Sequence, residues 1–156
     1  MQLARDASSL SISFFWRSGA VIVKDGVILS TGHSESALKK SSPDNIAKEN
    51  ERPKCTTRVL SIPNADDCMT CCFVDAGANA IAHAARVGTS LEGAIVYATV
   101  APCLMTLQLI AQAGIKAVYF EQDYELDTPE RKAYWQRIQQ DMNLGVCEQI
   151  LPIEAE

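Results

Sequence analysis

Two short apolar segments separated by a helical pattern constrain the fold of this chain more than any other feature. Segments 94–99 (AIVYAT) and 115–120 (IKAVYF) have the length of strands and lack the polar alternation of a half-exposed strand. Between them, apolar residues recur at helical spacing from Pro102 to Gly114. Pro102 is expected to open this helix, because its missing N–H costs nothing in the first turn. Strands that are apolar throughout predict a sheet covered on both faces, which is an α/β architecture.

The N-terminal half contains two further elements that fit this architecture. Segments 19–23 and 27–29 flank the turn sequence 24–26 (KDG), and an Asp-Gly pair between apolar runs predicts a β-hairpin. Segment 76–87 is rich in alanine and ends before Gly88, so we expect a helix that a glycine terminates.

The rest of the chain is expected to complete a single domain over 1–156. A helix is predicted over 129–142, and a last strand over 146–151. Residues 34–74 are mostly polar and lack a sustained period, which predicts a long loop inserted before the helix at 76–87. Loops of this length inside a compact domain usually have a functional or metal-organised role. A length of 156 residues with 47% hydrophobic residues is sufficient for one buried core.

Charge and composition exclude some classes of partner. The net charge of −5 disfavours sequence-independent binding of long nucleic acid, which requires a basic surface. No stretch approaches about 20 uninterrupted apolar residues, so no membrane span is expected. The N-terminus lacks the layout of a secretory signal, so we predict a cytoplasmic location with reduced thiols. The six cysteines are Cys55, Cys68, Cys71, Cys72, Cys103 and Cys147.

A broken signature carries the most specific functional information in the chain. Its two parts are Asp75-Ala76-Gly77 and Pro102-Cys103-Leu104-Met105-Thr106. With the flanking segments 58–63, 78–81, 88–101 and 112–116, this pattern resembles the deoxycytidylate deaminases of the cytidine deaminase superfamily. The superfamily signature is His-x-Glu followed by Pro-Cys-x-x-Cys. The resemblance implies a cytidine deaminase-like fold, which is a three-layer α/β/α sandwich around a mixed five-stranded sheet.

The resemblance also implies a catalytic site in which this chain differs at several positions. In these deaminases the histidine and both cysteines bind Zn²⁺, and the glutamate transfers protons. The resemblance places Asp75, Gly77 and Thr106 at the positions of the histidine, the glutamate and the second cysteine. Cys103 is retained. Gly77 has no side chain to transfer a proton, and Thr106 offers only a neutral hydroxyl, so we expect a degenerate pocket site without zinc.

Three hypotheses follow for the function. The first is a pseudoenzyme that keeps a pocket for a nucleotide or related small molecule, or acts as a subunit of an oligomer. The second is an enzyme that uses Asp75 and Cys103 for another reaction, since a helix N-terminus favours the thiolate. The third is a zinc-dependent (deoxy)cytidylate deaminase, a hydrolase, with an altered metal site. The first requires the fewest assumptions, because the substitutions remove a ligand and the proton shuttle together.

Four residues outside the signature are candidates for binding a substrate. His33 and Ser34 follow the second predicted strand, where relatives place a polar residue against the sugar, or they form a solvated turn. Arg58 lies in the long loop and could approach a phosphate, or it is a solvated surface residue. Asn79 lies one turn into its predicted helix on the side of Asp75, where a structural role is the alternative.

The cysteines of the long loop form a separate candidate metal site. Cys68 and Cys71 have the Cys-x-x-Cys spacing of zinc ligands, and Cys55 could supply a third thiolate. This set predicts a structural zinc, with reduced loop cysteines as the alternative. By analogy with relatives, a homo-oligomer is expected.

Overall fold

The computed structural model describes residues 1–11, 17–36, 73–123, 133, 136–137, 139–140 and 146–150. Most of the helix predicted over 129–142 lies outside these residues. The same is true of Arg58 and of the cysteine set Cys55, Cys68 and Cys71.

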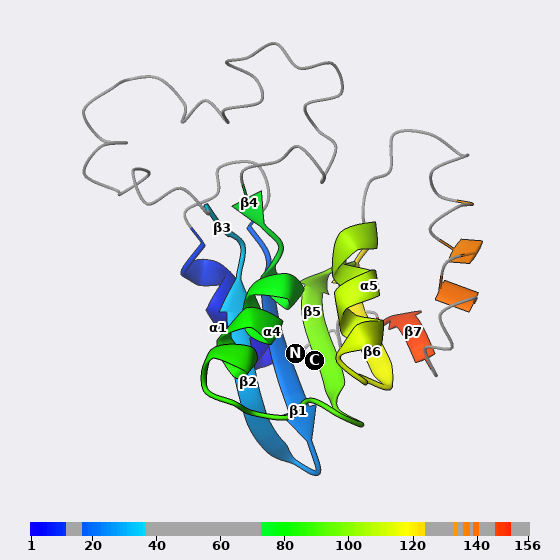
Figure 1. Cartoon of the computed structure of the whole chain (residues 1–156). Coiled ribbons are helices and arrows are strands. Elements are labelled where there is room, and N and C mark those ends of the chain that lie inside the picture. Colours follow the sequence, from blue (N-terminus) through cyan, green and yellow to red (C-terminus); the bar gives the residue numbers. More distant parts are fainter. Residues whose placement is uncertain are drawn as a thin grey trace, which may run out of the picture.

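A mixed sheet with strand order β2-β1-β5-β6-β7 forms the centre of the fold (Figure 1). Strand β1 pairs antiparallel with both β2 and β5, whereas β5, β6 and β7 run parallel to one another. The strands of this sheet are β1 Gly19–Lys24, β2 Val27–His33, β5 Ile95–Val100, β6 Ala117–Gln122 and β7 Val146–Gln149. A separate pair consists of β3 Glu35–Ser36 and β4 Phe73–Val74. The sheet is accompanied by the helices α1 Gln2–Ser9, α4 Ala76–Arg86 and α5 Leu104–Gln112.

The hairpin of β1 and β2 is confirmed, and its turn has the predicted chemistry. Asp25 has a φ of 49° and Gly26 a φ of 78°, which is the left-handed pair that a two-residue type I′ turn requires. Strand β2 extends to His33, beyond the apolar run over 27–29. The longer strand has a partner because Gly19 of β1 pairs with His33.

Two glycines bring the helices close to opposite faces of the sheet. A Cβ atom at Gly19 would overlap the backbone of α1 at Ala4 and Ser8. A Cβ atom at Gly32 would overlap the backbone of α4 at Ala76 and Ala80. Since Gly32 pairs with Ala20, the residue after Gly19, the two glycines face opposite sides of the sheet. The sheet therefore lies between α1 on one face and α4 on the other.

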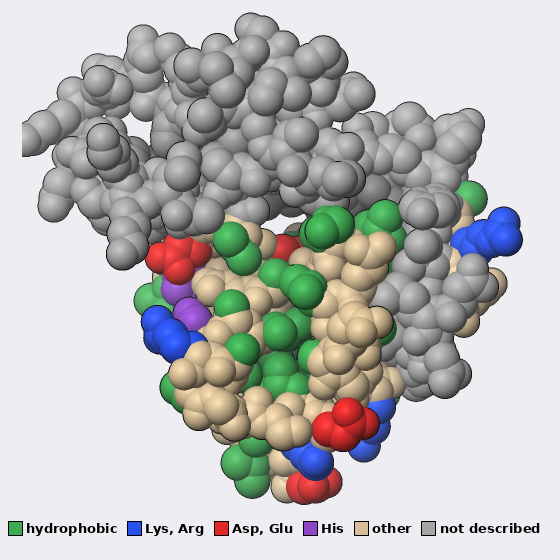
Figure 2. Space-filling view, in the orientation of Figure 1, with side chains coloured by type: hydrophobic (Ala, Val, Ile, Leu, Met, Phe, Trp, Pro, Cys, Tyr) green, Lys and Arg blue, Asp and Glu red, His purple; other side chains and the backbone are tan. Residues whose placement is uncertain are grey.

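The main hydrophobic core lies between the sheet and the layer of α4 and α5. Its fully buried side chains come from one face of the strands and from the inner sides of both helices. Figure 2 shows hydrophobic side chains between α4 and α5, with most charged side chains around the rim of this face. The largest buried core members are Ile22, Val96, Val118, Leu107 and Ile110.

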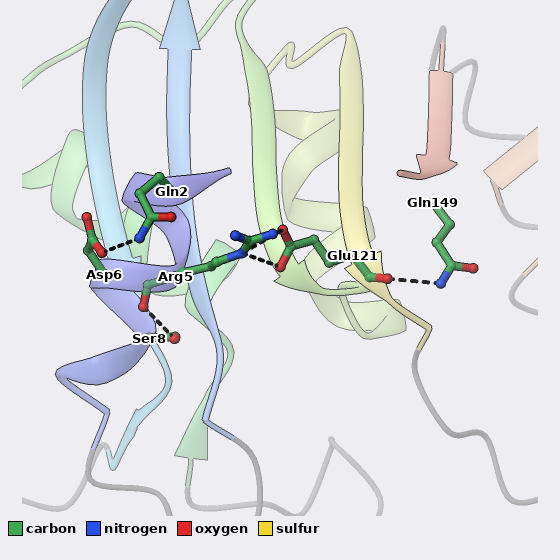
Figure 3. Close-up of polar contacts among 6 residues, drawn as sticks. All are labelled: Gln2, Arg5, Asp6, Ser8, Glu121 and Gln149. Carbon is green, nitrogen blue, oxygen red and sulfur yellow. Dashed lines mark hydrogen bonds and ion pairs between the residues drawn. The ribbon is translucent and has the colours of Figure 1, made fainter. Parts of the chain in front are cut away.

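On the opposite face, an ion pair joins α1 to strand β6 (Figure 3). The Arg5 guanidinium contacts the Glu121 carboxylate, with Nη2 2.6 Å from Oε1. The carbonyl of Glu121 accepts a hydrogen bond of 2.9 Å from the side chain of Gln149 at the end of β7. Helix α1 is thus connected to strand β6, 116 positions further along the sequence. In the described part of the chain, no helix is both long and apolar enough to cross a membrane.

Candidate functional site

The candidate site lies where the N-termini of α4 and α5 come together. Asp75 is the N-cap residue of α4, and its extended backbone has a φ of −61° and a ψ of 148°. Cys103 is the N-cap residue of α5, with a φ of −67° and a ψ of 167°. Helix α5 therefore begins after Pro102 rather than at it, because Cys103 still has the extended conformation of a cap. The two helices lie side by side on the same face of the sheet (Figure 1).

The Asp75 carboxyl group is held by hydrogen-bond donors from both helices. In α4, the Gly77 N–H donates to Oδ1 at 2.8 Å, and the Ala78 N–H also faces the carboxyl. In α5, the Cys103 N–H and the Thr106 hydroxyl donate to the same group. Asp75 is therefore an N-cap for its own helix and a contact to the first turn of the next helix.

Burial and hydrogen bonding have opposite effects on this carboxyl. The residue as a whole is partly exposed, but protein atoms surround its carboxyl group. Burial raises the pKa of Asp75 above its ordinary value, because desolvation disfavours the charged form. The N–H groups of Gly77 and Cys103 and the hydroxyl of Thr106 oppose this effect, since they stabilise the carboxylate. Desolvation is the larger effect, so the net direction is upward.

Cys103 and Thr106 complete a set of three residues in contact at this site. The Cys103 thiol lies 3.4 Å from the Thr106 hydroxyl, and both side chains are buried. Because the hydroxyl also faces the Asp75 carboxyl, it connects the two other groups. The three positions that the resemblance assigns to zinc ligands thus contact one another directly.

The place of a side chain at Gly77 is taken by Thr106. A Cβ atom added at Gly77 would lie 2.9 Å from the Thr106 Cγ2 methyl, a separation that real Cβ atoms essentially never show. The Asp75 Oδ1 atom would be 3.4 Å from the same Cβ atom. The position that the resemblance assigns to the catalytic glutamate therefore has no free volume next to its backbone.

Two candidate substrate-binding residues participate in one network at the end of β2. The Asn79 side-chain amide donates to the His33 carbonyl at 3.0 Å and to Glu35 Oε2 at 3.4 Å. Asn79 is buried, and its contacts join α4 to β2 and β3. A similar contact occurs further along α4, where His83 Nδ1 donates to the Thr31 carbonyl at 3.0 Å.

Ser34 lies in a buried group of serines. Its hydroxyl oxygen lies 2.7 Å from the Ser11 hydroxyl and accepts from the Ser18 N–H at 3.0 Å. Ser11 also interacts with the Ser34 carbonyl at 2.7 Å, and all three serines are buried. The Ser34 hydroxyl therefore connects the end of α1 to the β1–β2 hairpin.

Comparison with known proteins identifies the family. The chain matches the family model described as the cytidine and deoxycytidylate deaminase zinc-binding region over residues 1–122. It is also 31% identical over 152 residues to the deoxycytidylate deaminase of Enterobacteria phage T2, and the match covers 83% of this chain and 81% of that protein. The chain belongs to the cytidine and deoxycytidylate deaminase family.

Solved structures confirm the cytidine deaminase-like fold. The dCMP deaminase from cyanophage S-TIM5 in its apo form has a TM-score of 0.64 and 21% identity, and the match covers 96% of this chain and 92% of that chain. The structure of the same enzyme in complex with dCMP and dUMP gives a TM-score of 0.63, 23% identity and the same two coverages.

The described residues of this deaminase-family site do not fit the zinc that the family model names. Thr106 offers a neutral hydroxyl, and the Asp75 carboxyl already accepts hydrogen bonds from both helices. Asp75 and Cys103 are at most two zinc ligands, whereas a catalytic zinc has three protein ligands. Within the described ranges, no group of three or more His, Cys, Asp or Glu side chains is placed to hold a metal ion.

Sequence reasoning missed two features of this deaminase-family site. The first is the capping role of Asp75, although an Asp directly before a helix is a known N-cap signal. The second is the Ser11–Ser18–Ser34 group, for which no local pattern exists because its members come from separate segments.

Proposed function

We propose that this chain is a pseudo-deaminase, a member of the family that binds a nucleotide or related small molecule without catalysing zinc-dependent deamination. One observation carries the proposal. Thr106 contacts both Asp75 and Cys103 through its hydroxyl, and its methyl group occupies the space beside Gly77. A single side chain thus fills the places of a ligand and of the proton shuttle.

The chemistry of deamination explains why both changes matter. Attack on the ring requires a metal-activated water, and the leaving amine requires a proton from an acid. A positioned general acid–base group typically contributes about 10²–10⁴-fold to the rate. Gly77 cannot supply that group, and the polar groups of Asp75, Cys103 and Thr106 interact with one another.

A relative supports the proposed class of ligand. The cyanophage dCMP deaminase has been crystallised with dCMP and dUMP, and its fold covers nearly the whole of this chain. We propose a pyrimidine nucleotide, or a small molecule of similar shape, as the ligand here. We also propose that the chain forms a single domain over 1–156, assembles as a homo-oligomer and is located in the cytoplasm.

The other two hypotheses have less support. A catalytic pair of Asp75 and Cys103 requires an accessible thiol, whereas Cys103 is only 7% exposed and contacts Thr106. An altered metal centre would require a cysteine from the loop over 37–72, which lies outside the described residues.

The reaction is tested by restoring the family signature. We expect the wild-type protein to release no ammonia from dCMP in the presence of Zn²⁺. The triple variant Asp75→His, Gly77→Glu and Thr106→Cys should gain about one zinc per chain over wild type, measured by elemental analysis, and should deaminate dCMP. Zinc-dependent turnover by the wild-type protein would overturn the proposal.

Ligand binding is tested separately by calorimetric titration of the wild-type chain with dCMP and dUMP. Saturable binding of either nucleotide is expected, and deoxyribose 5-phosphate serves as a control that lacks the base. Equal binding of the control would show that no base is recognised, and the absence of all binding would overturn the ligand part of the proposal.

A further inference from the structure

The three zinc-ligand positions of the family form a closed hydrogen-bonded set in this chain. The Asp75 carboxyl accepts from the Cys103 N–H and from the Thr106 hydroxyl, and the hydroxyl lies 3.4 Å from the Cys103 thiol. In a metal site these same positions would be connected through the ion. Here the connection runs from one side chain to the next.

The described residues leave no buried side-chain nitrogen or oxygen atom at this site without a hydrogen-bond partner. A vacated metal pocket would be expected to contain buried donors or acceptors without partners. Throughout the described part of the chain, every buried side-chain nitrogen or oxygen atom has a hydrogen-bond partner.

We propose that the Asp75 carboxyl replaces the metal as the structural link between the N-termini of α4 and α5. The link consists of the donors Gly77 N–H and Ala78 N–H on α4 and Cys103 N–H and Thr106 hydroxyl on α5. A carboxylate suits this position, because the N–H groups in the first turn of each helix have no acceptor within the helix. This inference concerns the structure of the site and does not depend on nucleotide binding.

If Asp75 links both helices, both of its carboxyl oxygens should contribute to the stability of the fold. A serine at position 75 is a good N-cap for α4, but its single, shorter oxygen cannot also reach α5. Asp75→Ser therefore removes the link and keeps the cap. Thr106→Val is the matching change on α5, because it removes the hydroxyl and retains the shape of the side chain.

The experiment is a thermal unfolding cycle on the full chain with wild type, Asp75→Ser, Thr106→Val and the double variant. We expect Asp75→Ser to lower the melting temperature by at least about 4 °C, which is a measurable loss for a chain of this length. The loss in the double variant should be smaller than the sum of the two single losses, because both changes break the same link.

Three results would overturn the proposal. One is a melting temperature for Asp75→Ser equal to that of wild type, which would reduce Asp75 to a simple cap. Strict additivity of the two single losses is another. The third is a fall in wild-type melting temperature on adding a metal chelator that disappears in Asp75→Ser, which would place an ion at the carboxyl.

Discussion

The Asp75 carboxyl combines a favourable and an unfavourable contribution to stability. Its hydrogen bonds to the starts of α4 and α5 stabilise the fold, while its removal from water penalises the charged form. Because burial raises the pKa of Asp75, the carboxyl group binds a proton more tightly in the folded chain than in the unfolded chain. The part of the stability that depends on this proton is therefore fully present below the unfolded-state pKa of aspartate, about 3.9. It is lost as the pH rises through the higher folded-state pKa.

We predict a difference in pH dependence between wild type and Asp75→Asn. The asparagine cannot ionise, so its free energy of unfolding lacks this contribution to the pH dependence. As the pH rises from about 4 towards neutrality, wild type should lose stability relative to the variant. Urea unfolding of both proteins across this range measures the difference. A difference that stays constant, or that changes in favour of wild type, would contradict the prediction.

A second residue-level prediction concerns Gly77 and Thr106. Gly77→Ala should destabilise the protein by about 1–2 kcal/mol, because the new methyl group overlaps the Thr106 Cγ2 atom. Thr106→Ser removes that Cγ2 atom and serves as the matched background. There, Gly77→Ala should be neutral or stabilising, since alanine is a better helix former than glycine by about 1 kcal/mol. Equal effects of Gly77→Ala in both backgrounds, measured by urea unfolding, would show that Thr106 does not fill this space.

At the scale of elements, the helices, strands and turns that depend on neighbouring residues could be predicted from the sequence. The Asp25–Gly26 turn, the alanine-rich helix α4 and the apolar strands β5 and β6 follow from turn residues and from periodicity. The prediction that Pro102 opens α5 was wrong, because Cys103 is the N-cap residue and the helix begins at Leu104. The resemblance predicted that Asp75, Cys103 and Thr106 lie around one site. Their direct contacts with one another could not be predicted, since these depend on how two separate helices pack.

Helix α4 is positioned by Gly32, and we predict a large loss when that position gains a methyl group. Gly32→Ala should lower the free energy of unfolding by about 3 kcal/mol, because the methyl group meets the backbone of α4 and not a flexible side chain. Gly88→Ala is the control: its φ of +73° is unfavourable for alanine, but no atom lies within 4 Å of the added Cβ. That variant should lose only about 1 kcal/mol. Equal losses in urea unfolding would contradict close packing at Gly32.

At the scale of the whole molecule, the strand order sets how the layers are joined. The β1–β2 hairpin joins the parallel strands through the pairing of β1 with β5. The ion pair of Arg5 and Glu121 joins α1 to β6. The resemblance to the deaminases predicted the fold from the sequence, and the family model matches residues 1–122. The Arg5–Glu121 pair had no counterpart in any sequence pattern, since its two residues are 116 positions apart.

The pairing of β1 with β5 has a consequence for how this protein is made. During synthesis, the β1–β2 hairpin leaves the ribosome long before residues 95–100 can pair with the open edge of β1. Until then, that edge and the face of the hairpin that will contact α4 remain without their final partners. Pairing over such sequence distances is slow compared with local folding, so the emerging chain exposes an unpaired strand edge for longer than a helical protein of this size would.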